Sequence, residues 1–165
     1  MKQEDETRAT TLYFSIQPLD NWAYQNVDYN PPNFFGFTTN NAIEMFPNEF
    51  DNMSMVYGVI AQDGYYTLKN AKLSHYVKYK MDNPNLENIN GSKLLSKQDV
   101  TNLVHGTKIV KLIYDDPNSM YKLVLYLMQH NKDNYVAYYR ADKINLFDKY
   151  LPEFEQMIKT IKWID

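Results

Sequence analysis

Apolar runs separated by short polar breaks recur along the chain. In MYKLVLYLMQHNKDNYVAYYRA, residues 120–141, a mostly apolar run precedes a polar break and a second, tyrosine-rich run. Two such runs of strand length predict antiparallel strands joined by a hairpin. Because 120–128 is apolar at both alternating sets of positions, we expect a central strand that is covered on both faces.

The same pattern predicts further strands elsewhere in the chain. They fall at 12–16, 41–46, 54–61, 93–103 and 106–114. By contrast, segment 21–37 mixes turn formers with aromatic residues. Pro31 and Pro32 lack the N–H group that a strand ladder needs, so this segment predicts an irregular loop.

Helical spacing of apolar residues appears twice. The first helix, within 67–84, is predicted by Leu73, Tyr76, Val77 and Met81. The second, at the end of the chain, is predicted by Phe154, Met157, Ile158 and Ile161, with Pro152 in its first turn. The expected fold class is therefore α+β, an antiparallel sheet covered by helices.

Length and composition limit the remaining possibilities. At 165 residues we expect a single monomeric domain over 12–165, preceded by a disordered polar segment at 1–11. The absence of cysteine excludes disulfides and a thiol nucleophile. A net charge of −3 argues against a nucleic-acid partner. No run approaches the roughly 20 apolar residues of a membrane span, so we expect no membrane insertion.

The order of these elements, with HGTKIVKLIY (105–114) and YLPEFEQMIKTIKW (150–163), resembles the PsbP-like family. The opening YFSIQPLDNW (13–22) matches that family's pattern only loosely. The resemblance implies a PsbP/Mog-type α/β/α sandwich whose closing helix leads into a short terminal strand. It also implies a small accessory or assembly protein without a shared catalytic motif. Such a protein is extracytoplasmic or secreted if a signal or anchor was removed, and otherwise cytoplasmic.

Candidate chemistry is sparse. His130 and Asp133, in the hairpin turn, are the best-placed candidate metal ligands, although no paired-histidine spacing supports them. The Asp115-Asp116 pair precedes Pro117-Asn118 and is typical of a turn rather than of an acid–base dyad. We therefore predict no catalytic residue and no cofactor. The alternative is a metal-binding protein or a hydrolytic enzyme that uses His and Asp side chains.

Aromatic residues suggest binding instead. Tyrosine accounts for 15 of the 165 residues, and tyrosine serves both strands and binding surfaces. The tentative binding residues all lie in the irregular 22–37 segment: Trp22, Tyr24, Tyr29, Phe34 and Phe35. We expect one or two of them to remain accessible. The sequence thus predicts a non-enzymatic binding protein that engages a protein partner or a small ligand through an aromatic surface.

Overall fold

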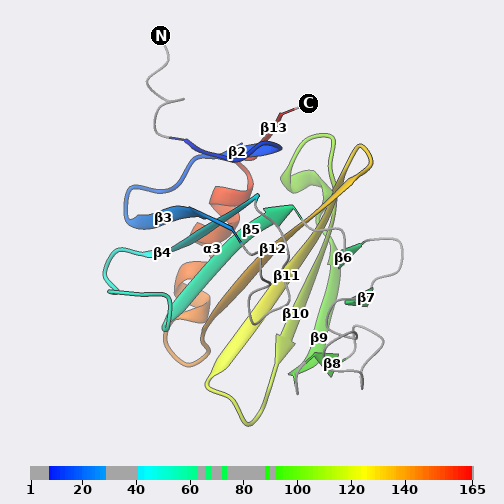
Figure 1. Cartoon of the computed structure of the whole chain (residues 1–165). Helices are drawn as coiled ribbons and strands as arrows, with labels where there is room; N and C mark the ends of the chain where they lie inside the picture. The colour runs from blue at the N-terminus through cyan, green and yellow to red at the C-terminus, as the bar shows by residue number, and fades with distance from the viewer. Residues whose placement is uncertain are drawn as a thin grey trace.

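An eight-stranded antiparallel sheet forms the centre of the computed structural model, with one α-helix packed against one face (Figure 1). The structure describes residues 8–28, 41–62, 66–67, 72–73, 88–89 and 92–164. The strand order is β3-β4-β5-β12-β11-β10-β9-β8. In chain order these strands are β3 (Trp22–Val27), β4 (Ala42–Pro47), β5 (Val56–Gln62), β8 (Asn88–Ile89), β9 (Ser92–Asp99), β10 (Lys108–Asp115), β11 (Tyr121–His130) and β12 (Asp133–Asp142).

A three-stranded sheet joins two segments that are far apart in the sequence. It has the order β1-β2-β13 and consists of β1 (Ala9–Thr10), β2 (Phe14–Ile16) and β13 (Lys162–Trp163). The backbone N–H of Gln17 also donates to Oγ1 of Thr160, at 2.8 Å. The segment that precedes the strands of the large sheet in the sequence is therefore bonded to the segment that follows them.

Three short elements complete the described chain. Strands β6 (Tyr66–Thr67) and β7 (Lys72–Leu73) form an antiparallel pair of their own. A 3₁₀ turn, η1 (Thr101–Leu103), connects β9 to β10. The predicted strand at 93–103 thus ends at residue 99, because the chain turns at η1 before it re-enters the sheet.

Strand β11 lies inside the large sheet, between β12 and β10. Leu125 is opposite Tyr138 on β12 and Leu112 on β10, and the register runs without a shift on both sides. Its side chains alternate between the two faces. Tyr126 is buried on the helix face, whereas Leu125 is buried on the opposite face. The prediction of a central strand covered on both faces is confirmed.

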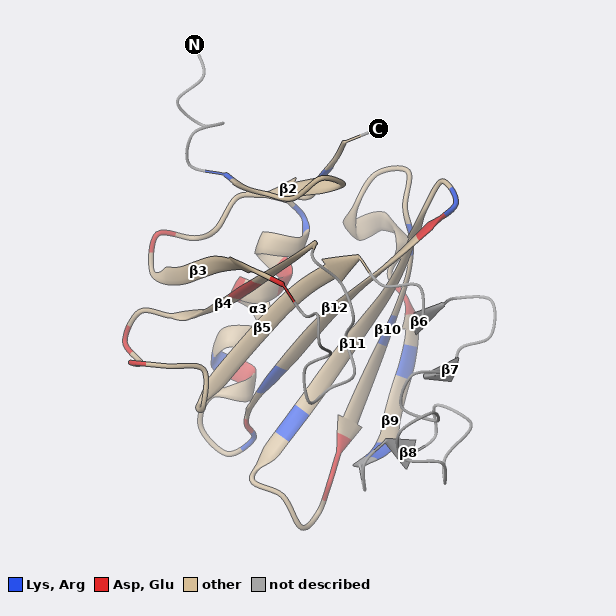
Figure 2. Cartoon of the chain, in the orientation of Figure 1, with Lys and Arg blue, Asp and Glu red and all other residues tan. Residues whose placement is uncertain are grey.

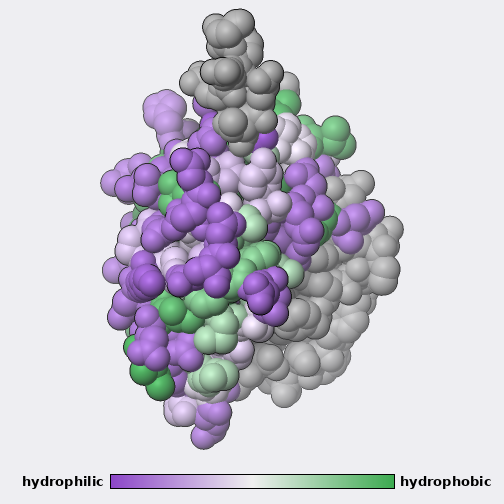
Figure 3. All heavy atoms as spheres, turned by 90° about the vertical axis from the view of Figure 1, so that its left-hand side faces the viewer, coloured by the Kyte–Doolittle hydropathy of each residue, from purple (hydrophilic) through white to green (hydrophobic). Residues whose placement is uncertain are grey.

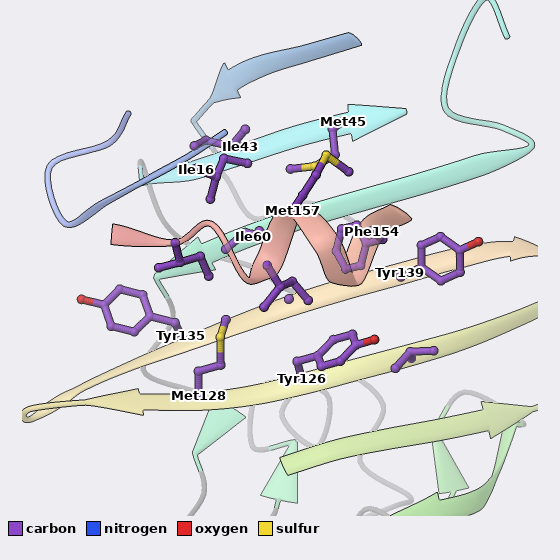
Figure 4. Packing of buried hydrophobic residues seen from close by; sticks show 14 of the residues in the cluster. Ile16, Ile43, Met45, Ile60, Tyr126, Met128, Tyr135, Tyr139, Phe154 and Met157 are labelled. Atoms are coloured by element: carbon purple, nitrogen blue, oxygen red, sulfur yellow. The ribbon is translucent and has the colours of Figure 1, made fainter. Parts of the chain in front are cut away.

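Helix α3 (Phe147–Ile158) covers one face of the sheet. In the close view, Phe154 and Met157 point from the helix into the cluster formed by the strands (Figure 4). The Phe154 ring lies against Gly58 of β5, where an added Cβ would come within 2.5 Å of its Cε1 atom. The helix can therefore approach β5 this closely only because residue 58 has no side chain.

The helix begins earlier than the sequence predicts. Phe147 and Tyr150 are buried and belong to the same apolar face as Phe154. Pro152 lies inside the helix rather than in its first turn, which corrects the prediction. Burial of two aromatic side chains ahead of the proline accounts for the additional turn, because it offsets the backbone hydrogen bond that proline removes.

The predicted α/β/α sandwich is wrong. The described residues contain one α-helix, α3, and otherwise consist mainly of antiparallel strands. The helix predicted within 67–84 overlaps Thr67 of β6 and all of β7, and the rest of that segment lies outside the described residues. Segment 21–37 is also not irregular throughout, because β3 occupies its first part. The architecture is a mostly β fold and not a PsbP-like sandwich with helices on both faces.

Candidate binding surface

Three large apolar side chains are exposed at one end of the large sheet. Ile144 is 80% exposed, Met120 53% and Met55 37%. They belong to the connections 48–55, 116–120 and 143–146, which lie at the lower end of the sheet in Figure 1. We call these three connections the loop end. Exposed apolar residues that gather in this way are a common mark of interaction sites.

Backbone hydrogen bonds hold the three connections side by side. The N–H of Asp142 donates to the carbonyl of Met55 at 3.3 Å. The N–H of the next residue, Lys143, donates to the carbonyl of Met120 at 2.9 Å. Because Ile144 follows directly, the three exposed residues lie on backbone segments that are hydrogen-bonded to one another at residues 142 and 143.

Side-chain bonds fix the same region further. The Lys143 ammonium donates to Oδ1 of Asp115 at 3.0 Å and to the carbonyl of Asp116 at 2.8 Å. Oδ1 of Asp142 accepts the backbone N–H of Ile144 at 2.9 Å. Ile144 therefore projects from a bonded turn. Residues of both charge signs lie at this end of the sheet, among them the ion pair of Lys143 and Asp115 (Figure 2).

A layer of aromatic and cationic groups supports the loop end. The Arg140 guanidinium lies over the Tyr121 ring, 4.6 Å from its centroid, and over the Tyr57 ring at 5.8 Å. The Tyr121 hydroxyl donates to the carbonyl of Ser54 at 2.9 Å. A surface held in this way loses little conformational freedom when a partner binds.

The side of the molecule drawn in Figure 3 carries both polar and apolar residues at its surface. Hydrophilic residues prevail there, and apolar residues reach the surface between them and toward the lower end. This lower end is the one at which the loops lie in Figure 1. The loop end is hard to foresee from the sequence because Met55 and Met120 fall in the predicted strands 54–61 and 120–128, and Ile144 is an isolated apolar residue in a polar turn. The one available signal was an isoleucine within the turn sequence DKIN.

Of the five residues of the predicted aromatic surface, the structure describes Trp22 and Tyr24. Trp22 is buried, its indole N–H donates to Oε1 of Glu153 at 2.9 Å, and its ring lies 5.9 Å from that of Tyr150. Trp22 is therefore a core residue under the helix, which corrects its assignment as a surface residue. Tyr24 is exposed, as expected for part of the set. Tyr29, Phe34 and Phe35 lie outside the described residues.

The candidate metal ligands face each other across the β11–β12 hairpin. His130 pairs with Asp133 in the strand register. The imidazole stacks on the indole of Trp163, with ring centroids 4.8 Å apart and planes 9° apart. Within the described residues no three His, Asp or Glu side chains gather in a way that could hold a metal ion. The stacking of His130 on Trp163 is a packing contact between the hairpin and β13.

A charged group between helix and sheet was also missed. Oε2 of Glu155 on α3 forms an ion pair with the Lys111 ammonium and accepts the Tyr126 hydroxyl at 2.6 Å. Burial, together with this nearby carboxylate, raises the pKa of Tyr126 far above its usual value. The hydroxyl therefore stays protonated and serves as a donor. The arrangement ties the helix to β10 and β11.

Comparisons with known proteins show no family. No protein-family profile and no curated protein match the chain. A crystal structure of a protein from Bacteroides thetaiotaomicron is similar over 92% of the chain, with 10% sequence identity and a TM-score of 0.47. The match covers 45% of that protein, so the chain spans less than half of its length. Among the described residues, no helix is long and apolar enough to cross a membrane.

Proposed function

We propose that this chain is a non-enzymatic binding protein that engages a protein partner through the loop end. The observation that carries the proposal is the exposure of Ile144, Met120 and Met55 on three connections that hydrogen bonds hold together. Binding is favourable when a partner removes apolar side chains from water. The conformational entropy lost on binding is small when these side chains lie on a rigid support.

The side chains suit this role for different reasons. Methionine is flexible and polarisable, and it adapts to irregular partner surfaces. Ile144 is stiff and is the most exposed of the three, so it resembles an anchor residue that enters a pocket of the partner. Arg140 and Tyr121 bond to the backbone of the 48–55 connection and add the residue types that are enriched at interfaces. The proposal uses the loop end rather than the 22–37 segment, in which Trp22 is buried and residues 29–37 lie outside the described part of the chain.

The test uses random linear peptides displayed on phage and selected against the immobilised protein. We expect enriched peptides to bind wild type and to bind Ile144→Ser and Met120→Ser about tenfold more weakly, as for the loss of an interface anchor. Amide shifts in NMR spectra should fall on residues 53–57, 115–121 and 140–146.

Leu12→Ser is the matched control, because Leu12 is also an exposed apolar residue and lies in the turn between β1 and β2. This variant should bind the peptides as wild type does. If no peptide is enriched, or if binding is insensitive to Ile144→Ser, the proposal fails. Equal losses in Ile144→Ser and Leu12→Ser would also exclude the loop end.

A further inference from the structure

Among the described residues, the methionine side chains differ in their exposure. Met45, Met128 and Met157 are fully buried in the core under the helix. Met55 and Met120 are exposed at the loop end, and the half-buried Met53 lies in the same loop as Met55. The chain has no cysteine, so the thioethers are its oxidisable sulfur atoms. Oxidation of methionine follows the access of the oxidant to the sulfur.

We propose that Met55 and Met120 form a reversible oxidation site that changes the loop end from apolar to polar. The oxidant is hydrogen peroxide: its O–O bond breaks, one oxygen forms an S=O bond with the thioether sulfur, and the other oxygen takes both hydrogens and leaves as water. The sulfur loses two electrons and the peroxide gains them. A thiol-dependent sulfoxide reductase returns the thioether, with the thiols oxidised to a disulfide and the oxygen released as water.

The structure separates this change from the stability of the fold. Met55 and Met120 are anchored through their backbone carbonyls, which accept hydrogen bonds from residues 142 and 143. The side-chain sulfur takes no part in these bonds. The three core methionines have no exposed surface and therefore react only when the protein opens. Oxidation at the surface thus alters the chemistry of the loop end while the sheet and helix remain folded.

The consequence for binding rests on the proposed function. A sulfoxide is polar and accepts hydrogen bonds, so burying it in an apolar interface without a donor is unfavourable. The oxidised loop end should therefore hold an apolar partner less tightly. Leucine has a similar volume and cannot be oxidised, so Met55→Leu/Met120→Leu gives a protein with the same surface and without the switch.

The experiment exposes the folded protein to hydrogen peroxide and follows each methionine by peptide mass spectrometry. We expect Met120 and Met55 to react at least about tenfold faster than Met45, Met128 and Met157, with Met53 between the two groups. The melting temperature should stay within a few degrees of the untreated protein. Retention on a hydrophobic-interaction column should fall, and reductase treatment should restore it.

The double leucine variant should keep its column retention after peroxide. Oxidation of the core methionines at rates similar to those of Met55 and Met120 would overturn the inference, as would unfolding at the first oxidation step. Unchanged retention after oxidation of both residues would also overturn it. These readouts need no partner, so they decide this inference even where peptide selection has refuted the proposed function. Where selection succeeds, unchanged peptide affinity after oxidation refutes the switch alone.

Discussion

At the scale of single residues, Tyr114 stands out because its hydroxyl is buried and finds no hydrogen-bond partner within the part of the chain that the structure describes. Its side chain lies in the second core cluster, beside Leu112 and Leu125. Burial raises the pKa of Tyr114 well above its usual value, so the hydroxyl is neutral. A buried hydroxyl that gave up its water without gaining a partner costs about 1–3 kcal/mol.

Tyr114→Phe is therefore expected to leave the free energy of unfolding unchanged or to raise it by about 1 kcal/mol. Urea unfolding measures the difference. Tyr139→Phe is the control, because the Tyr139 hydroxyl donates to the carbonyl of Phe147 at 2.9 Å. The control should lose about 1 kcal/mol. A comparable loss in Tyr114→Phe would show that its hydroxyl has a partner.

Glu155 gives a second prediction at this scale. Its side chain is 24% exposed and that of Lys111 14%, so solvent screens this ion pair only in part. Glu155→Ala removes the partner of both Lys111 and Tyr126 and should lower the free energy of unfolding by about 1–3 kcal/mol. The exposed pair of Glu49 and Lys149 is the comparison, and Glu49→Ala should cost less than about 1 kcal/mol. Equal effects of the two substitutions would contradict the structural role of Glu155.

At the scale of elements, β11 has the largest expected effect on stability. Leu125 is buried between strands on both sides, and Leu125→Ala should cost about 2–5 kcal/mol, measured by urea unfolding. Leu95 on β9 is exposed, so Leu95→Ala should cost less than about 0.5 kcal/mol. A loss below about 1 kcal/mol for Leu125→Ala would show that the site repacks or lies at an edge.

The elements also show where sequence patterns suffice. Strand β11 and the hairpin to β12 were predicted because alternation and a short polar break are local signals. The cover of the sheet was predicted wrongly, because residues 72 and 73 pair with β6 through contacts that helical spacing cannot reveal. Strand β3 was missed because Pro31 and Pro32 were taken to exclude a strand from the whole 21–37 segment. A proline removes an N–H group only at its own position, and β3 ends before both of them.

The candidate surface was less predictable than the strands. Trp22 carries the same sequence signal whether it faces a partner or a helix, and its contacts with Glu153 and Tyr150 come from the far end of the chain. Ile144 and Met120 become a surface only when the strands bring their turns together. Both depend on long-range pairing, which no local pattern specifies.

At the scale of the whole molecule, buried tyrosines set the response to alkaline pH. Burial raises the pKa of Tyr114, Tyr126 and Tyr139 above the ordinary value of 10.0. Above that value the unfolded chain releases protons that the folded chain retains, so the free energy of unfolding falls as pH rises. The contribution is fully present below pH 10.

We therefore expect the melting temperature to be steady up to about pH 9 and to fall steeply above about pH 10. Scanning calorimetry across this range measures the slope. Tyr114→Phe removes one of the titrating groups and should make the decline shallower. A melting temperature that stays level to about pH 11 would show that the tyrosines ionise in the folded state.

The sheet formed by β1, β2 and β13 bears on how the chain folds during its synthesis. Strand β2 pairs with residues 162 and 163, and Gln17 bonds to Thr160. The N-terminal strand therefore cannot complete its pairing until residues 160–163 have been synthesised. A ribosome adds roughly 5–20 residues per second, so β2 leaves it several seconds before β13 exists. Throughout that interval Phe14 and Ile16 lack their final partners and offer apolar surface to chaperones. Emergence of β13, rather than emergence of the strands of the large sheet, is then the event that completes the fold.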